Sequence, residues 1–230
     1  MYGHLSIRTW TIHPNSSLEL KYKYLVIEGN IGAGKTSLAT MLAKESGSRL
    51  VLEAFSNNPF LAKFYEDPGR YAFQLELSFL SERYHQIKNE LGHPDLFGQS
   101  VISDYFLAKS FIFSKYNLKD DEMKLFEKLF SLINLQAPKP DLYVYLHVPV
   151  DKLLDNIKLR GRDYEKHIQY DYLKEVQDGY FGFFKSQQEM KILVIDTSNL
   201  DFVNKKHDFE ELKRNIFEGS FSMGMNMLIL

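Results

Sequence analysis

One stretch of nine residues constrains this 230-residue chain more than any other part of it. Residues 28–36 read Glu-Gly-Asn-Ile-Gly-Ala-Gly-Lys-Thr, after the apolar run 24–27 and before a helical pattern with Leu38, Met41 and Leu42 on one face. A strand, the spacing G-x-x-x-x-G-K-T and a helix together define the phosphate-binding loop. The sequence therefore predicts a strand–loop–helix unit that binds a nucleoside triphosphate.

Each residue type in this loop has a chemical task. Glycines let backbone N–H groups turn toward phosphate oxygens, where a side chain would clash, and the helix N-terminus adds positive partial charge. Lys35 is expected to reach the β- and γ-phosphates and the Thr36 hydroxyl to ligate Mg²⁺. The residues assigned to the phosphates of ATP are Gly29, Asn30, Ile31, Gly32, Ala33, Gly34, Lys35 and Thr36.

Length and composition narrow the class of protein further. A chain of 230 residues fits one large α/β domain, and the absence of cysteine excludes disulfides and thiolate metal sites. The net charge of −2 argues against nucleic acid as a partner. No apolar run approaches the roughly 20 residues that span a bilayer, and the first residues do not resemble a signal peptide. We therefore expect a soluble, cytoplasmic protein without a membrane or nucleic-acid partner.

Strand and helix patterns alternate along most of the chain. This alternation predicts a five-stranded parallel sheet with helices on both faces, in one α/β domain. The first 22 residues have no assigned role, and the apolar tail, residues 219–230, is expected to pack on the body or to contact another subunit. Strands are expected at about 23–28, 49–52, 100–103, 141–146 and 191–195, and helices at about 35–46, 58–67, 70–90, 106–115, 120–136, 150–159, 169–186 and 207–218.

Two carboxylates follow expected strands directly. Glu53 comes after the second strand and Asp104 after the third. Ligands of parallel sheets bind outside the carboxyl ends of the strands, so both side chains are expected at the same edge as the phosphate loop. Glu53 is either a solvated strand end or a general base, and Asp104 is either a solvated strand end or a holder of Mg²⁺, directly or through water.

Arginines flank a glycine between two expected helices, as Arg160 and Arg162 around Gly161. This segment is either a solvated basic turn or a lid whose guanidinium groups close over phosphates and neutralise transition-state charge. Glu165 lies three residues beyond and is within reach of the same pocket.

Two classes of nucleotide-binding protein fit these features, a small-molecule kinase and a nucleotide switch or motor. A guanine-nucleotide switch should carry an N-K-x-D motif, and the nearest string, at residues 204–207, reads Asn-Lys-Lys-His without the aspartate. An arginine lid suits a kinase, which must exclude water from the transferring phosphoryl group. We favour the kinase.

Several segments together resemble the deoxynucleoside kinases, over the chain from about Lys23 to the last expected helix. Within that family the similarity is greatest to the purine-directed bacterial type, the deoxyadenosine and deoxyguanosine kinases. The segments that carry the resemblance are residues 28–36, 58–61, 64–68, 75–83, 103–105 and 160–165.

The resemblance implies that residues 23–218 form a deoxynucleoside kinase domain with a lid at about 160–168, usually in a homodimer. It implies phosphorylation of a deoxynucleoside 5′-hydroxyl by ATP and Mg²⁺. The roles implied by position are Glu53 as base, Tyr65 and Glu165 on the 3′-hydroxyl with crowding that disfavours ribose, Arg160 and Arg162 as lid arginines, Glu76 and Arg83 facing the nucleobase, and Asp201 with Phe202 near the adenine of ATP.

The expected mechanism follows from these roles. The 5′-hydroxyl gives its proton to Glu53 as it attacks the γ-phosphorus, while charge is stabilised by Lys35, by Mg²⁺ on Thr36 and Asp104, and by the lid arginines. The alternative is a nucleoside monophosphate kinase of the thymidylate kinase type. That acceptor needs additional arginines for its own phosphate, and none is clearly placed in the sequence.

The chain departs from the wider family at two positions. Tyr105 follows Asp104 where many members have arginine, so either one phosphate contact is lost or Lys109, one helical turn on, replaces it. Glu76 stands where many members have glutamine. Both departures bear on how the nucleoside is held.

The second departure concerns the choice of base. Glu76 and Arg83 are seven residues apart and share a helix face. An ionised Glu76 only accepts hydrogen bonds, which suits the two adjacent donors of guanine, whereas adenine fits only a protonated carboxyl or a contact through its 6-amino group alone. By resemblance we expect deoxyadenosine as substrate, with deoxyguanosine a close second and pyrimidines poor.

Overall fold

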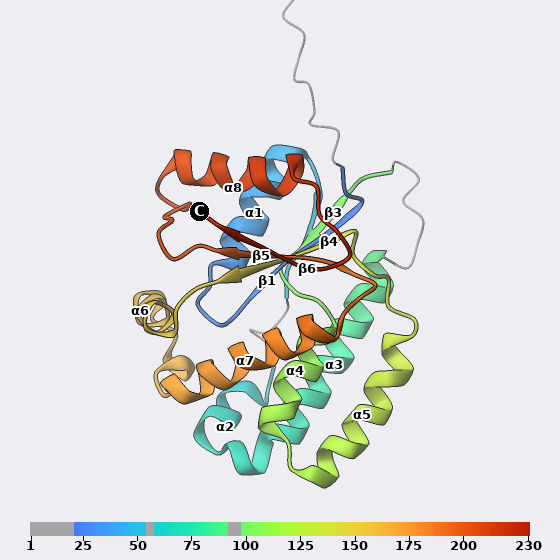
Figure 1. The fold of residues 1–230 in the computed structure, drawn as a ribbon. Helices are drawn as coiled ribbons and strands as arrows, with labels where there is room; N and C mark the ends of the chain where they lie inside the picture. Colours follow the sequence, from blue (N-terminus) through green and yellow to red (C-terminus); the bar gives the residue numbers. More distant parts are fainter. Residues whose placement is uncertain (1–20, 54–57, 92–97) are drawn as a thin grey trace, which may run out of the picture.

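The computed structural model of the protein describes residues 21–53, 58–91 and 98–230. The expected N-terminal extension, residues 1–22, lies outside these ranges except for Lys21 and Tyr22. Strands and helices alternate through the described residues, as expected (Figure 1). The strands are β1 (Tyr24–Gly29), β2 (Arg49–Val51), β3 (Val101–Ser103), β4 (Leu142–His147), β5 (Lys191–Asp196) and β6 (Gly224–Ile229). The α-helices are α1 (Lys35–Ser46), α2 (Leu61–Glu66), α3 (Pro68–Leu91), α4 (Ala108–Asn117), α5 (Asp120–Asn134), α6 (Val150–Arg160), α7 (Tyr170–Ser186) and α8 (Lys206–Glu218).

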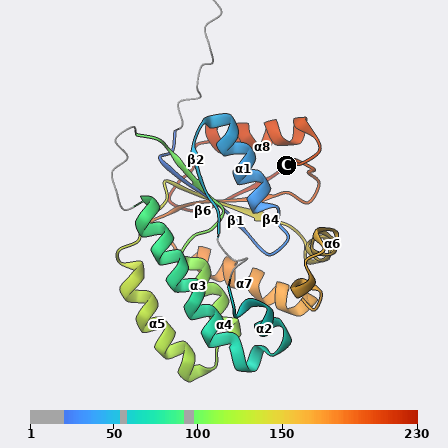
Figure 2. The same cartoon turned by 180° about the vertical axis from the view of Figure 1, so that it is seen from behind.

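The strands form one sheet in the order β2-β3-β1-β4-β5-β6, and every pairing is parallel. The register places Val26 of β1 between Ser103 of β3 and Tyr143 of β4. Helices α1 and α8 cover one face, and α3, α4, α5 and α7 lie on the other (Figures 1 and 2). The expected α/β architecture with helices on both faces is confirmed.

The expected number of five strands was wrong, because the described residues form a sheet of six. The tail that we expected to pack on the body or to contact another subunit contains β6, which pairs in parallel with β5 from Lys191↔Gly224 to Asp196↔Ile229. Its side chains alternate in burial, with Met227 63% and Ile229 78% exposed. The helix α8 returns the chain to the same end of the sheet, so the tail can satisfy the open backbone groups of β5.

Two apolar layers hold the helices to the sheet. One includes Leu38 of α1 and Leu212 of α8, and both are fully buried. The other is rich in aromatic rings, where Tyr145 of β4 lies 4.8 Å from Tyr180 and 5.0 Å from Phe184 between ring centroids. The central strands β1 and β4 are therefore covered on both faces, as their continuous apolar sequences predict.

Helix α3 contributes two of the expected site residues. It spans 24 residues, and both Glu76 and Arg83 on it are buried, 2% and 4% exposed. Within the described residues, no helix combines the length and the apolar character needed to cross a bilayer.

Candidate active site

The phosphate loop has the backbone that its glycines predict. Gly32 and Gly34 both adopt a φ of 85°, and a Cβ atom at Gly34 would lie 2.8 Å from Cζ of Phe202. The Lys35 ammonium donates to the carbonyl oxygen of Asn30 at 2.9 Å. Burial, together with the nearby Lys109 cation, lowers the pKa of Lys35 to about 8. The Lys35 ammonium is thus already held against the loop, where phosphates bind.

Three neighbouring strands bring the loop and the two carboxylates to one edge. Asp104 follows β3 directly, Glu53 follows β2 by one residue, and the loop follows β1. The Thr36 hydroxyl donates to Oδ2 of Asp104 at 2.5 Å, and the backbone N–H of Glu53 donates to Oδ1 at 2.7 Å. The sheet edge therefore gathers the expected base and the expected metal ligands.

The residues Thr36 and Asp104 fit a magnesium site. They present a hydroxyl and a carboxylate side by side at the mouth of the loop, and oxygen is the ligand that Mg²⁺ prefers. The described residues contain no group of three or more histidine, cysteine or acidic side chains that would hold an ion by themselves. Kinase sites commonly bind Mg²⁺ through one or two protein oxygens together with phosphates and water, so this pair is sufficient.

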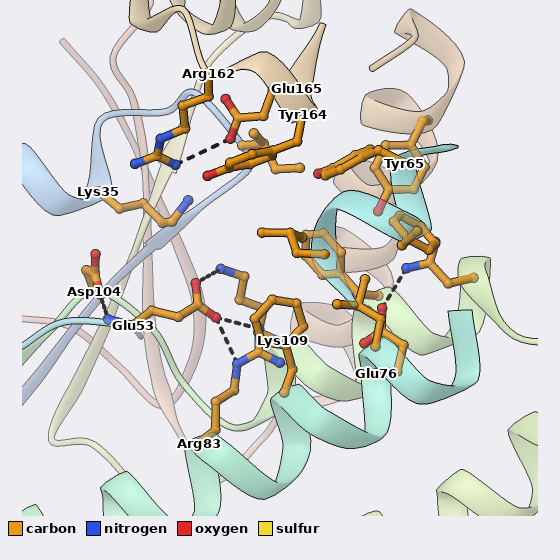
Figure 3. Close-up of a pocket in the computed structure, with 18 of the residues that line it drawn as sticks. Lys35, Glu53, Tyr65, Glu76, Arg83, Asp104, Lys109, Arg162, Tyr164 and Glu165 are labelled. Atoms are coloured by element: carbon orange, nitrogen blue, oxygen red, sulfur yellow. Dashed lines mark hydrogen bonds and ion pairs between the residues drawn. The ribbon is translucent and has the colours of Figure 1, made fainter. Parts of the chain in front are cut away.

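Glu53 is held by two cations. Arg83 donates to its Oε1 through Nε at 2.9 Å and Nη2 at 2.5 Å, and the Lys109 ammonium lies 2.5 Å from its Oε2 (Figure 3). Burial raises the pKa of Glu53, but the charges of Lys109 and Arg83 outweigh it and lower the pKa to about 2. The carboxylate is therefore ionised and fixed in orientation.

The contacts of Lys109 and Arg83 differ from those expected. Lys109, which we considered as a replacement for the arginine missing after Asp104, has its ammonium on Glu53. Arg83 lines the cavity, but its remaining terminal nitrogen, Nη1, donates to the Ser110 hydroxyl, so its donors serve Glu53 and Ser110. Its expected contact with the base stays a prediction that this arrangement does not favour.

The lid segment is closed on an acidic side chain. Arg160 donates to Oε2 of Glu165 through Nε at 3.0 Å and Nη2 at 2.6 Å, and Nη1 of Arg162 lies 3.3 Å from Oε1. Glu165 is 4% exposed. Beside it, the ring of Tyr65 stacks on that of Tyr164 with 6.1 Å between centroids (Figure 3). The expected lid arginines and 3′-hydroxyl residues thus lie together.

Glu76 lies at the other end of the cavity from Glu53 (Figure 3). The Asn117 amide nitrogen donates to its Oε1 at 2.6 Å, and its Oε2 is buried without a hydrogen-bond partner in the described part of the chain. Phe79 and Phe113 line the cavity between the two ends. Burial raises the pKa of Glu76 to about 7, against a smaller opposing effect of the Asn117 hydrogen bond.

This cavity meets a second one at the phosphate loop. The second cavity is lined by loop residues, by α6 and by the segment around Asp201 and Phe202, which we expected near the adenine of ATP. Six residues line both cavities: Lys35, Thr36, Glu53, Asp104, Arg160 and Arg162. A donor bound on one side and an acceptor bound on the other would therefore meet at these groups.

Comparison with known proteins identifies the class. The family model of deoxynucleoside kinases matches residues 25–219, so the chain belongs to the deoxynucleoside kinase family. The expected resemblance and the kinase class are confirmed, and the protein is an enzyme of that family.

Among curated relatives, the deoxyguanosine kinase of Bacillus subtilis is 37% identical over 85% of this chain and 96% of its own length. The deoxyadenosine kinase of Lactobacillus acidophilus is 29% identical, over 84% of this chain and 94% of the relative. A solved structure of the M. mycoides deoxyadenosine kinase with bound dATP has a TM-score of 0.72 at 23% identity, covering 84% of this chain and 98% of that one. This last likeness shows the fold.

Several side chains of the site were not predicted from the sequence. Asn117 and Ser110 lie on α4 and meet Glu76 and Arg83 of α3 only because the two helices pack together. Tyr164 lies within the segment that resembles the family, yet its stacking on Tyr65 depends on the lid's position. These contacts form only when helices that are distant in the sequence pack together, so no local sequence pattern predicts them.

Proposed function

We propose that the protein transfers the γ-phosphoryl group of ATP to the 5′-hydroxyl of a purine deoxynucleoside, as a salvage step. The observation that carries this proposal is the junction of the two cavities at Lys35, Glu53 and Arg162. A phosphate loop faces a buried carboxylate there. In-line transfer to a bound hydroxyl needs this juxtaposition of donor site and acceptor site.

We assign the 5′-hydroxyl to Glu53. A carboxylate with a pKa near 2 is ionised at neutral pH, so it accepts a hydrogen bond from the hydroxyl and takes its proton as the new O–P bond forms. Lys35, Arg160 and Arg162 neutralise the charge of the transferring group once the lid arginines leave Glu165 for the phosphates. Mg²⁺ on Thr36 and Asp104 would supply further charge neutralisation at the phosphate oxygens.

We assign the 3′-hydroxyl of the sugar to Tyr65 and Glu165. Glu165 is buried between the two lid arginines, and a hydroxyl beside it completes a polar cluster. The stacked rings of Tyr65 and Tyr164 form a flat wall at the same place. We expect this wall to crowd a 2′-hydroxyl, which favours deoxyribose over ribose.

We place deoxyguanosine ahead of deoxyadenosine, which reverses the order expected from the sequence. The buried, unpartnered Oε2 of Glu76 is an acceptor, and guanine offers two adjacent donors, N1–H and the 2-amino group. The relative with 37% identity carries the name deoxyguanosine kinase, which agrees with this order. Pyrimidines would leave Oε2 of Glu76 without a donor, at a cost of about 1–3 kcal/mol.

A nucleoside monophosphate kinase of the thymidylate type is the weaker candidate. Its acceptor phosphate needs arginine partners of its own, whereas Arg83 of this cavity is bound to Glu53 and the lid arginines are assigned to the transferring phosphoryl group. An uncharged hydroxyl is the acceptor that suits a carboxylate such as Glu53.

The test is a panel assay with ATP and Mg²⁺ on the four deoxynucleosides, guanosine and dTMP. We expect kcat/KM to rank deoxyguanosine first, deoxyadenosine second, and the pyrimidines, guanosine and dTMP far below. Lys35→Ala, checked for folding by circular dichroism, should abolish every activity, because its ammonium offsets charge that grows on the leaving γ-phosphoryl group. A preference for thymidine or dTMP would overturn the proposal.

Two further expectations rest on the sequence alone and stay proposals, a homodimer and a cytoplasmic location. Size-exclusion chromatography with light scattering tests the first, and fractionation of expressing cells tests the second.

A further inference from the structure

The end of the acceptor cavity farthest from the phosphate loop holds a polar pair that no step of phosphoryl transfer uses. Glu76 of α3 and Asn117, the last residue of α4, are joined by the 2.6 Å hydrogen bond from the amide nitrogen to Oε1. Glu76 is 2% exposed, and its Oε2 has no partner among the described residues. A buried acceptor without a donor is costly, so this atom is where a ligand donor is needed.

We propose that Asn117 is a specificity-determining residue, because its amide nitrogen keeps Glu76 a hydrogen-bond acceptor and so selects guanine over adenine. This inference rests on the proposed function, since it takes the cavity to hold a purine deoxynucleoside. An amide nitrogen donates and never accepts. A nitrogen that donates to Oε1 therefore favours the ionised carboxylate and leaves Oε2 as the acceptor that meets the base.

The electrostatic surroundings show why one amide has this influence. Burial is the largest effect on Glu76 and raises its pKa to about 7, and the Asn117 hydrogen bond is the largest effect in the opposite direction. Near neutral pH both the protonated and the ionised form of Glu76 are therefore populated, and one hydrogen-bond donor changes their ratio. The other titratable groups that face Glu76 are Arg83 of α3, Lys109 of α4, Glu53 after β2 and Tyr172 of α7.

The two purines need different forms of Glu76. Guanine offers N1–H and the 2-amino group, both donors, and pairs with an ionised carboxylate. Adenine offers one donor, the 6-amino group, beside the acceptor N1, and pairs with a carboxyl that carries a proton. Whatever sets the protonation of Glu76 therefore sets the ratio of kcat/KM for deoxyguanosine to that for deoxyadenosine.

The first test variant is Asn117→Asp, which keeps the shape of the side chain and replaces the donor with a second carboxyl. The new carboxyl lies against buried Glu76, so the pair shares one proton at neutral pH and Oε1 of Glu76 loses its permanent donor. We expect the deoxyguanosine to deoxyadenosine ratio to fall by roughly tenfold or more, the scale of one hydrogen bond to a charged group. The acidic limb of the pH profile of kcat/KM for deoxyguanosine should move to higher pH, which a merely structural role would not produce.

Asn117→Leu is the second variant, in case the aspartate variant does not fold. It removes the donor without adding an acid, so the ratio should move in the same direction. The matched control is Asn134→Asp, the same change at the exposed last residue of α5, and it should leave the ratio unchanged. Thermal melts of all three proteins separate folding from recognition.

The outcomes distinguish this inference from the proposed function. Deoxyinosine, which keeps N1–H but lacks the 2-amino group, should follow deoxyguanosine in its response to both Asn117 variants. If the wild-type protein phosphorylates purine deoxynucleosides and both folded variants keep the ratio and the pH profile, the role of Asn117 is overturned and the proposed function stands. If the wild-type protein phosphorylates no purine deoxynucleoside, both fall together.

Discussion

Two buried glutamates lie at opposite ends of one cavity, and their surroundings give them opposite properties (Figure 3). Glu53 touches two cations at 2.5 Å, and its pKa falls to about 2. Glu76 touches one neutral amide, and its pKa rises to about 7. Desolvation acts on both carboxyls, but their neighbours leave Glu53 ionised at neutral pH at the proposed reaction end and Glu76 close to its pKa at the proposed base end.

The difference teaches which partner a buried carboxyl needs for which task. A cation offsets the desolvation cost and fixes both the charge and the orientation of the carboxylate, so that it can accept a hydrogen bond from a hydroxyl. An amide donates to one carboxyl oxygen but does not offset the desolvation cost of the charge, so the protonation of the carboxyl still depends on the bound ligand. The predictions that follow test this contrast, from the largest expected effect to the smallest.

The largest effect should come from Glu53→Gln. The amide keeps the shape but cannot take the proton of the 5′-hydroxyl, so we expect kcat to fall by on the order of 10²–10⁴. The KM for the nucleoside should change little, because binding depends on the sugar and base contacts. Steady-state kinetics on a folded variant measures both quantities. An unchanged kcat would transfer the role of base to Asp104, the next carboxylate at the same edge.

Lys109→Met should have the next largest effect, because it removes one of the two cations from Glu53. The carboxylate then keeps Arg83 but loses charge and orientation at Oε2, and we expect kcat to fall by roughly 10²-fold, the scale seen when one preorganised electrostatic partner is removed. The control is Lys115→Met on the same helix, whose exposed side chain lies over Phe111 outside the cavity. Equal activity of the two variants would show that Arg83 alone positions Glu53.

The positions of the two glutamates were partly predictable from the sequence, whereas the partners that set their pKa values were not. The loop, Glu53 and Asp104 were placed correctly because each follows a strand, and parallel strands end at one edge. The ion pair of Lys109 with Glu53 joins residues 56 apart in the chain, and the hydrogen bond from Asn117 to Glu76 joins residues 41 apart. Such contacts depend on helix packing, and no local pattern encodes them.

The sixth strand was missed for a related reason. The apolar, uncharged character of residues 224–229 predicts burial or contact and does not by itself specify a strand. They become β6 because β5 offers an open row of backbone groups beside them. Contacts between segments that are distant in the sequence thus determine both the last strand and the partners of Glu53 and Glu76.

The dependence of stability on pH should differ between the two glutamates. The pKa of Glu76 is raised from 4.5 to about 7 in the folded state, so its contribution to stability is complete below pH 4.5 and is lost as pH rises toward 7. The pKa of Glu53 is lowered, so its contribution is complete above pH 4.5 and is lost as pH falls toward 2. Of these two glutamates, Glu76 is therefore the one that titrates between pH 5.5 and 8.

Glu76→Gln removes that titration. Between pH 5.5 and 8 we expect the free energy of unfolding of the wild-type protein to fall relative to the variant by about 2 kcal/mol. Thermal melts at several pH values measure this difference, with Glu53→Gln as the control that should follow the wild-type protein in this range. Parallel curves for the Glu76 variant and the wild-type protein would show that Glu76 is ionised throughout.

The smallest effect is a change of preference rather than of rate. In Glu76→Gln the side chain presents one acceptor and one donor, a pattern that matches the edge of adenine and mismatches the two adjacent donors of guanine. We expect the ratio of kcat/KM for deoxyguanosine to that for deoxyadenosine to fall by about tenfold, the scale of one misplaced hydrogen bond. The kcat for deoxyadenosine should be retained, because Glu53, Lys109 and Lys35 at the other end of the cavity are unchanged. The same substitution at the two glutamates would then separate the ends of the cavity, with Glu53→Gln lowering kcat for every substrate and Glu76→Gln reordering the substrates. A uniform loss of kcat in the Glu76 variant would mean that the two ends are coupled and that Glu76 does not read the base.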